Sequence, residues 1–112
     1  MAGALTTHIL DTARGRPAAG IRVELWSVDG ERRACLKTAQ TNADGRTDEP
    51  LLGPDEMKAG EYELIFFAGD YFEEKAPFLD RVPVRFRISD VQASYHVPLL
   101  CSPWSYTTYR GS

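Results

Sequence analysis

The chain has 112 residues, of which 43% are hydrophobic and 26% charged, values that predict one globular domain over residues 1–112. Its formal net charge of −3 disfavours a nucleic-acid partner, which usually meets a concentrated basic face, and no apolar run approaches the roughly 20 residues of a membrane helix. The first residues lack a basic segment followed by an apolar one, and the last residues are not the Ser-Lys-Leu address, so we expect a cytoplasmic protein.

The first predicted strand covers residues 5–11, where polar and apolar side chains alternate. One face carries Thr6, His8 and Leu10, and the other carries Thr7, Ile9 and Asp11. A buried histidine needs a hydrogen-bond partner, so we place His8 on the outward face.

Similar alternation around residues 21–26, 62–67 and 84–88 predicts three further strands, each with one face on a core. Turn-forming residues separate them, among them the run from Asn42 to Gly45. Asp70 followed by Glu73 has the pattern of a helix N-cap with its reciprocal glutamate, and Pro77 ends that segment. One short helix is therefore expected near residues 70–76.

Two strands are predicted at the end of the chain, over residues 94–101 and 104–111. On the first, the face that carries Val97 and Leu99 is the more apolar, so His96 should point away from the core. On the second, Tyr109 and Arg110 lie on opposite faces. Short strands, frequent turns and a single helix together predict an all-β fold, a two-sheet β-sandwich.

The two cysteines, Cys35 and Cys101, are too few for a disulfide framework, and we expect both to be small buried hydrophobic residues. No paired cysteine and histidine spacing of the zinc type occurs, so a metal site is not predicted.

His8 and His96 are the only histidines, and histidine can exchange a proton near neutral pH. Taken singly, each histidine is also explained as a strand residue without a function. Arg46 and Arg110, taken singly, are also explained as solvated surface charges. The last strand adds Tyr109, Ser112 and the α-carboxylate, groups that can recognise a small polar ligand. Ser112 lacks the Gly-x-Ser-x-Gly surroundings of a nucleophilic serine.

Four segments resemble a known family in their order and spacing: LTTHILDTARGRPAAGIRVELW, TNADGRTD, GEYELIFFAGDYF and SYHVPLLCSPWSYTTYRGS. They are similar to the transthyretin-like family and, within it, to the 5-hydroxyisourate hydrolases of urate breakdown. The closing Tyr-Arg-Gly-Ser is the most specific motif, followed by the His-Ile-Leu-Asp-Thr that starts at His8. The resemblance covers essentially the whole chain.

The resemblance implies a transthyretin-like sandwich of eight strands in two sheets with one short helix. Four subunits would form a homotetramer, a dimer of dimers, with the active sites in a central channel between facing sheets. The small-molecule substrate in this family is 5-hydroxyisourate, whose six-membered ring is opened by hydrolysis of an amide bond without a metal or cofactor.

The site residues implied by the resemblance form two overlapping sets. The catalytic set is His8, Arg46, His96 and Ser112, and the substrate-binding set is His8, Arg46, Tyr109, Arg110 and Gly111. One histidine would take a proton from water, which typically contributes ~10²–10⁴-fold, while Arg46 would hold the substrate and the developing negative charge. Which histidine is the base stays open at this point, with His8 favoured.

Two hypotheses of other classes remain beside the hydrolase. The first is a non-catalytic small-molecule carrier, of the hormone-carrying type, that uses the same tetramer channel. The second is a β-sandwich interaction module without a site. The hormone-carrying transthyretins share the fold but lack this histidine and arginine set and the closing motif, so the resemblance places the chain with the enzymes.

Overall fold

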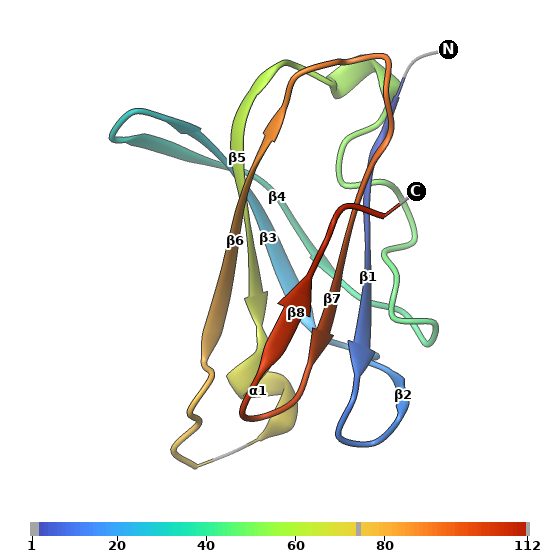
Figure 1. Cartoon of the computed structure of the whole chain (residues 1–112), viewed down its shortest axis with the longest axis vertical. Coiled ribbons are helices and arrows are strands. Elements are labelled where there is room, and N and C mark those ends of the chain that lie inside the picture. Colours follow the sequence, from blue (N-terminus) through green and yellow to red (C-terminus); the bar gives the residue numbers. More distant parts are fainter. Residues whose placement is uncertain (1–2, 74, 112) are drawn as a thin grey trace.

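The computed structural model describes residues 3–73 and 75–111. Over these residues the chain forms eight strands in two four-stranded sheets, as the family resemblance implies (Figure 1). The elements are β1 Leu5–Asp11, β2 Arg16–Pro17, β3 Arg22–Asp29, β4 Arg32–Gln40, the 3-10 helix η1 Pro54–Glu56, β5 Gly60–Phe67, α1 Ala68–Phe72, β6 Arg81–Ile88, β7 Tyr95–Cys101 and β8 Tyr106–Thr108. The strand order is β2-β1-β7-β8 in sheet A and β4-β3-β5-β6 in sheet B.

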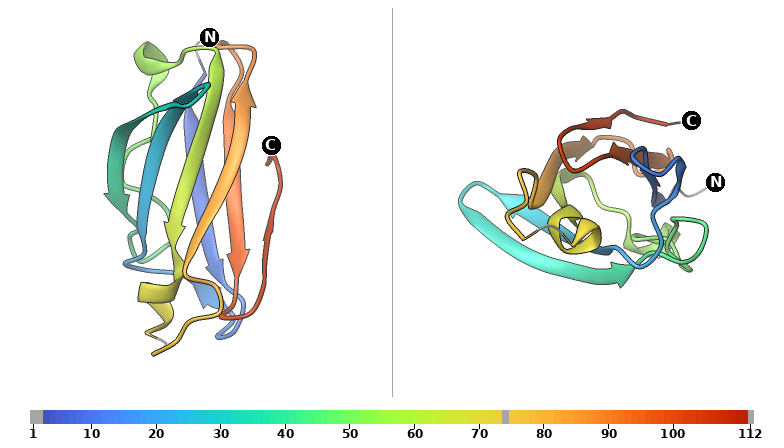
Figure 2. Two further views of the ribbon diagram at one scale, coloured as in Figure 1. Left: turned by 90° about the vertical axis from the view of Figure 1, so that its left-hand side faces the viewer. Right: turned by 90° about the horizontal axis from the view of Figure 1, so that it is seen from below.

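The two sheets stack as layers around one hydrophobic core (Figure 2). Fully buried side chains come from both inner faces: Leu5, Ile9 and Leu99 from sheet A, and Val23, Leu25, Leu64 and Phe66 from sheet B. Burying one such side chain stabilises a fold by about 1.5–3 kcal/mol. Within residues 3–73 and 75–111, no helix has the length and apolar character needed to cross a membrane.

The pairing of β1 with β7 positions the candidate site. These strands run parallel, and their register sets Thr6 beside His96 and His8 beside Pro98. Burial alternates along β1, so that Thr6, His8 and Leu10 are partly exposed while the residues between them are buried. His96 is likewise partly exposed between buried neighbours on β7. The prediction that both histidines point away from the core is confirmed.

Strand β4 has no counterpart among the predicted strands. It is an edge strand of sheet B whose residues are mostly exposed, so no apolar alternation marks it in the sequence. Cys35 lies on it and is exposed, which makes the expectation of two buried cysteines wrong for this residue. Cys101 is buried, and burial raises the pKa of its thiol to about 11.

The helix is present but begins and ends earlier than the range 70–76. Helix α1 follows β5 directly, and Asp70 lies inside it instead of capping its start. Three of its five residues are buried, so contact with the core determines where it begins. Glu73 ends it in the left-handed conformation, with φ 56°, and donates its backbone N–H to the Gly69 carbonyl.

The last strand, β8, is shorter than the predicted range 104–111. The Ser102 hydroxyl accepts the backbone N–H groups of Trp104 and Ser105, at 3.2 and 3.1 Å, and so holds these residues in a turn. After Thr108 the chain meets β7 again at a single bridge between Gly111 and His96.

Asp11, the last residue of β1, is a fully buried carboxylate that links β1 to α1. It accepts hydrogen bonds from the Tyr71 hydroxyl at 2.8 Å, from the Arg14 backbone N–H at 3.0 Å and from the Arg14 guanidinium at 2.9 Å. Burial alone raises the pKa of Asp11, but the bonds from Tyr71 and Arg14 outweigh it, so the pKa lies below its ordinary 3.8.

Replacing Asp11 by Asn is expected to lower the free energy of unfolding by about 2 kcal/mol at pH 7, because hydrogen bonds to a charged group contribute about 1.5–3 kcal/mol. The folded pKa lies below the unfolded one, so this stabilisation is present above about pH 4 and is lost as the pH falls through the folded pKa. Urea unfolding at fixed protein concentration measures it. Tyr71→Phe, which removes one of the three bonds, should cost less, and an Asp11→Asn variant as stable as the wild type would contradict this reading.

Candidate active site

The two histidines lie on the outward face of sheet A, on its two central strands. Because Thr6 pairs with His96 in the parallel register, their side chains are neighbours, and the Thr6 hydroxyl lies 2.9 Å from Nδ1 of His96. A hydroxyl can donate or accept, so this contact orients the ring without fixing which nitrogen carries the proton.

Arg46 reaches the same face from the turn between β4 and η1. A backbone bridge pairs Arg46 with His8, and the Ile9 N–H donates to the Gly45 carbonyl at 2.8 Å. Gly45 has φ +76°, and a Cβ at this position would lie 2.4 Å from the Ile9 carbonyl oxygen. Only glycine therefore allows this turn to lie directly against β1.

The turn also binds the imidazole of His8. Its Nε2 lies 2.9 Å from the backbone carbonyl oxygen of Asp44. A carbonyl can only accept, so Nε2 carries the proton of the neutral ring and Nδ1 carries the lone pair. His8 is thus held with Nδ1 as its basic atom.

His96 is kept neutral by its surroundings. Burial of the ring is the largest cause that lowers its pKa, followed by the positive charge of Arg46 and then by His8. The pKa therefore lies below the ordinary 6.5, and the ring is uncharged at pH 7.

The effect of the Arg46 charge on the pKa of His96 can be tested without a substrate. In Arg46→Ala the pKa of His96 should rise toward 6.5, because one nearby positive charge is gone, but stay below 6.5 while the ring stays buried. NMR titration of the two histidines measures this, and Arg32→Ala, at an exposed position on β4, is the matched control. An unchanged pKa of His96 in Arg46→Ala would show that the guanidinium does not act on it.

The end of the chain passes next to His96. The Gly111 N–H donates to the His96 carbonyl at 2.7 Å, and a Cβ on Gly111 would lie 2.5 Å from Cδ2 of the ring. Glycine is therefore required here by close approach. Tyr109 is 57% exposed and lies two residues before this contact.

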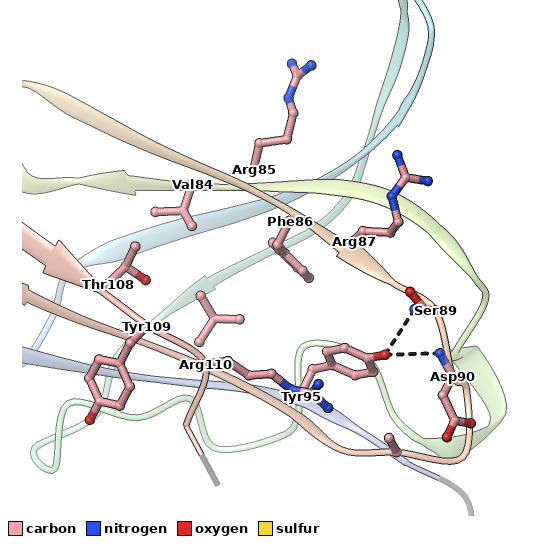
Figure 3. Close-up of a pocket in the computed structure, with 12 residues that line it drawn as sticks. Val84, Arg85, Phe86, Arg87, Ser89, Asp90, Tyr95, Thr108, Tyr109 and Arg110 are labelled. Atoms are coloured by element: carbon pink, nitrogen blue, oxygen red, sulfur yellow. Dashed lines mark hydrogen bonds between the residues drawn. The ribbon is translucent and has the colours of Figure 1, made fainter.

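Arg110 is not brought to the two histidines. Its guanidinium lies 4.2 Å from the centroid of the Tyr95 ring, and it donates to the Ser94 carbonyl at 3.2 Å. Figure 3 shows the side chains of Tyr109 and Arg110 pointing in different directions from the strand. Ser112, predicted to be catalytic, lies outside the described residues.

The groove drawn in Figure 3 is separate from the histidine cluster. It has a volume of 560 Å³ and lies between β6 and β8, the edge strands of the two sheets, with Phe86, Tyr95 and Arg110 among its lining residues. Neither histidine nor Arg46 lines it. Among residues 3–73 and 75–111, no three His, Cys, Asp or Glu side chains gather as a metal site.

The arrangement combines the imidazole of His8, whose Nδ1 is left available by the contact with Asp44, the imidazole of His96, whose pKa is lowered, and the guanidinium of Arg46. Such a set can deprotonate water and stabilise negative charge on a carbonyl oxygen. No sequence pattern marks Thr6, the carbonyl of Asp44 or the side chain of Asn42 as part of the site. The run Asn-Ala-Asp-Gly predicts a turn, but it does not predict which residues the turn contacts.

Comparisons with known proteins show which family the chain resembles over its length. Residues 5–111 match the model of the HIUase/Transthyretin family. A 5-hydroxyisourate hydrolase of Deinococcus radiodurans is 54% identical over 113 residues, covering 96% of this chain and 95% of that protein. The structure of Klebsiella pneumoniae 5-hydroxyisourate hydrolase matches with a TM-score of 0.81 at 35% identity, covering 98% of this chain and 94% of that one. Transthyretin from Sparus aurata matches with a TM-score of 0.87 at 27% identity, covering 96% of each chain.

Proposed function

The chain belongs to the HIUase/Transthyretin family, and we propose that it hydrolyses 5-hydroxyisourate by means of His8, Arg46 and His96. Full-length similarity to proteins named 5-hydroxyisourate hydrolase supports the hydrolase activity. The observation that supports the assignment of the site is that the backbone of Arg46 is bridged to His8 and that the charges of Arg46 and His8 both act on His96, on the outward face of sheet A.

In the proposed reaction, His8 is the general base. Its Nδ1 takes a proton from water while the water oxygen attacks the carbonyl carbon of the cyclic amide. Arg46 stabilises the negative charge that develops on the carbonyl oxygen. When the carbon–nitrogen bond breaks, the imidazolium of His8 returns the proton to the leaving nitrogen. One water is thereby added across the amide bond, which gives an N–H group and a carboxylic acid that releases its proton to solvent.

His96 serves as a neutral hydrogen-bonding group in this scheme. Its Nδ1 is engaged with Thr6, so its Nε2 is the nitrogen available to orient the substrate. We assign Gly111 to the edge of the same site, since it meets β7 at His96. Tyr109 lies two residues earlier and lines the groove of Figure 3, so its substrate-binding role stays a prediction. Arg110 contacts Tyr95 and Ser94 instead of the histidines. The role of Ser112, which lies outside the described residues, stays a prediction.

The test of this proposal follows the ultraviolet absorbance of freshly made 5-hydroxyisourate with and without the protein. We expect the decay to accelerate in proportion to the protein concentration. A carrier that uses the same face would bind the compound without accelerating its decay, and that outcome would reject the hydrolase. The alternative has little physical support, because holding an apolar ligand does not require two histidines beside an arginine.

We further propose that the chain assembles as a homotetramer, a dimer of dimers. Among the described residues, β6 and β8 are edge strands of the two sheets, and edge strands are templates for pairing with another copy. The outer face of sheet B carries ion pairs of Glu61 and Glu63 with Arg85 and Arg87, as expected for a face in contact with water. The partly exposed residues of β1 and β7 in sheet A include no Asp, Glu, Lys or Arg, which suits a channel wall. Light scattering should give four times the 12.5 kDa chain mass, and a monomer would reject the assembly.

A further inference from the structure

We propose that Asn42 is a positioning residue of this site: its side chain holds the turn that fixes the protonation pattern of His8 and places Arg46. This inference rests on the hydrolysis proposed above, and it assigns a role to a residue outside the strands whose side chain bonds within the turn. Its basis is the set of hydrogen bonds that Asn42 makes across the turn.

Asn42 closes the turn with five hydrogen bonds. Its Oδ1 accepts the backbone N–H groups of Asp44 at 2.9 Å and Arg46 at 3.2 Å, and its Nδ2 donates to Oδ1 of Asp48 at 3.0 Å. Its backbone N–H donates to the Arg46 carbonyl at 2.7 Å, and its carbonyl accepts the Gly45 N–H at 3.0 Å. Three of these five bonds depend on the side chain.

The first consequence concerns His8. The backbone N–H of Asp44 donates to Oδ1 of Asn42, and the Asp44 carbonyl, in the next peptide unit, accepts the Nε2–H of His8. The position of this carbonyl decides which nitrogen of the ring is protonated. Without the Asn42 side chain the turn keeps the backbone bond of Gly45 but loses the bonds that hold the residues on both sides of this carbonyl-bearing unit, at Asp44 and Arg46, so the carbonyl is held less firmly and the His8 ring can exchange its proton between Nε2 and Nδ1.

The second consequence concerns Arg46. Both backbone groups of this residue bind Asn42, the N–H to its side chain and the carbonyl to its backbone N–H. The backbone of Arg46 is thereby fixed beside His8, where the bridge between the two residues lies. One side chain therefore sets the relative position of the base and of the cation, and displacements of about 1 Å between such groups can cost on the order of 10²-fold in rate.

Two measurements on Asn42→Ala test the proposal. In ¹⁵N NMR of the imidazole rings, His8 of the wild type should show a protonated Nε2 and an unprotonated Nδ1, and its assignment is simple because the chain has two histidines. In Asn42→Ala the two nitrogen signals should move toward each other as the tautomers exchange. We expect kcat to fall on the order of 10²-fold. Wild-type signals together with wild-type kcat would overturn the proposal.

The double variant Asn42→Asp, Asp48→Asn separates positioning from a general loss of structure. It keeps an Oδ1 acceptor for both backbone N–H groups and exchanges the amide and the carboxylate of the third bond without setting two carboxylates together, so it should restore the wild-type tautomer and most of the lost kcat. If Asn42→Ala does not fold, this double variant alone still decides, since a folded double variant with mixed His8 tautomers would overturn the proposal.

The matched control is Asp90→Ala. The Asp90 carboxylate accepts the backbone N–H of Gln92 at 2.9 Å in a similar turn outside the histidine cluster, so both measurements should be unchanged. Failure of the wild type to accelerate decay of the substrate would reject the proposed reaction, whereas the NMR measurement reads the effect of Asn42 on His8 independently of any activity.

Discussion

Replacing His8 by Ala should lower kcat/KM for 5-hydroxyisourate by ~10²–10⁴-fold, the contribution typical of a positioned general base. The expected loss is large because Nδ1 of His8 is the nitrogen that the contact with Asp44 leaves available to water. His96 should not replace it, since burial and the charge of Arg46 both lower the pKa of His96 and so disfavour its protonation. The measurement is the initial rate of substrate decay over a range of concentrations.

His8→Gln provides a sharper form of the same experiment. The amide N–H₂ of glutamine can replace Nε2–H as the donor to the Asp44 carbonyl, but glutamine cannot accept a proton at neutral pH. We therefore expect His8→Gln to be folded and nearly as slow as His8→Ala. Added imidazole should restore part of the rate in His8→Ala. If either variant kept the wild-type rate, His8 would not be the base.

Replacing Arg46 by Ala is expected to lower kcat by ~10²–10³-fold, as for the removal of a group that stabilises an oxyanion. The side chain has no salt-bridge partner among the described residues, so its charge is available to a ligand. Arg46→Lys should recover only part of the rate, because an ammonium group lacks the paired donors of the guanidinium. Rates of both variants at saturating substrate measure the effect on kcat.

The control for Arg46 is Arg32→Ala, an exposed arginine on the edge strand β4, which should keep the wild-type rate. Unfolding of each variant in urea separates a catalytic loss from a loss of stability. If Arg46→Ala changed KM alone and left kcat intact, Arg46 would bind the substrate without stabilising the transition state.

The strands in which apolar and polar residues alternate, and so show which face is buried, could be predicted from the sequence. Alternation identified β1 and β7, and with them the outward direction of His8 and His96. Strand β4 was missed because an exposed edge strand has no apolar face to reveal it. The start of α1 was misplaced because burial against the core, rather than a cap at Asp70, determines where the helix begins.

The site could be predicted only as a set of residues. No local pattern shows that Thr6 lies next to His96, because 90 residues separate them and a parallel register brings them together. The sequence indicated a turn before Arg46 but could not show that this turn binds the imidazole of His8. The sequence also could not show that the adjacent residues Arg110 and Gly111 have different neighbours. Gly111 pairs with His96, whereas Arg110 lies over the ring of Tyr95.

The most direct test compares the decay rate of 5-hydroxyisourate at increasing concentrations of two proteins, the wild type and a triple variant with alanine in place of His8, Arg46 and His96. The rate should rise linearly with the wild type and should not rise with the triple variant, although both fold and have the same mass by light scattering. Equal slopes for the two proteins would show that hydrolysis takes place elsewhere on the molecule.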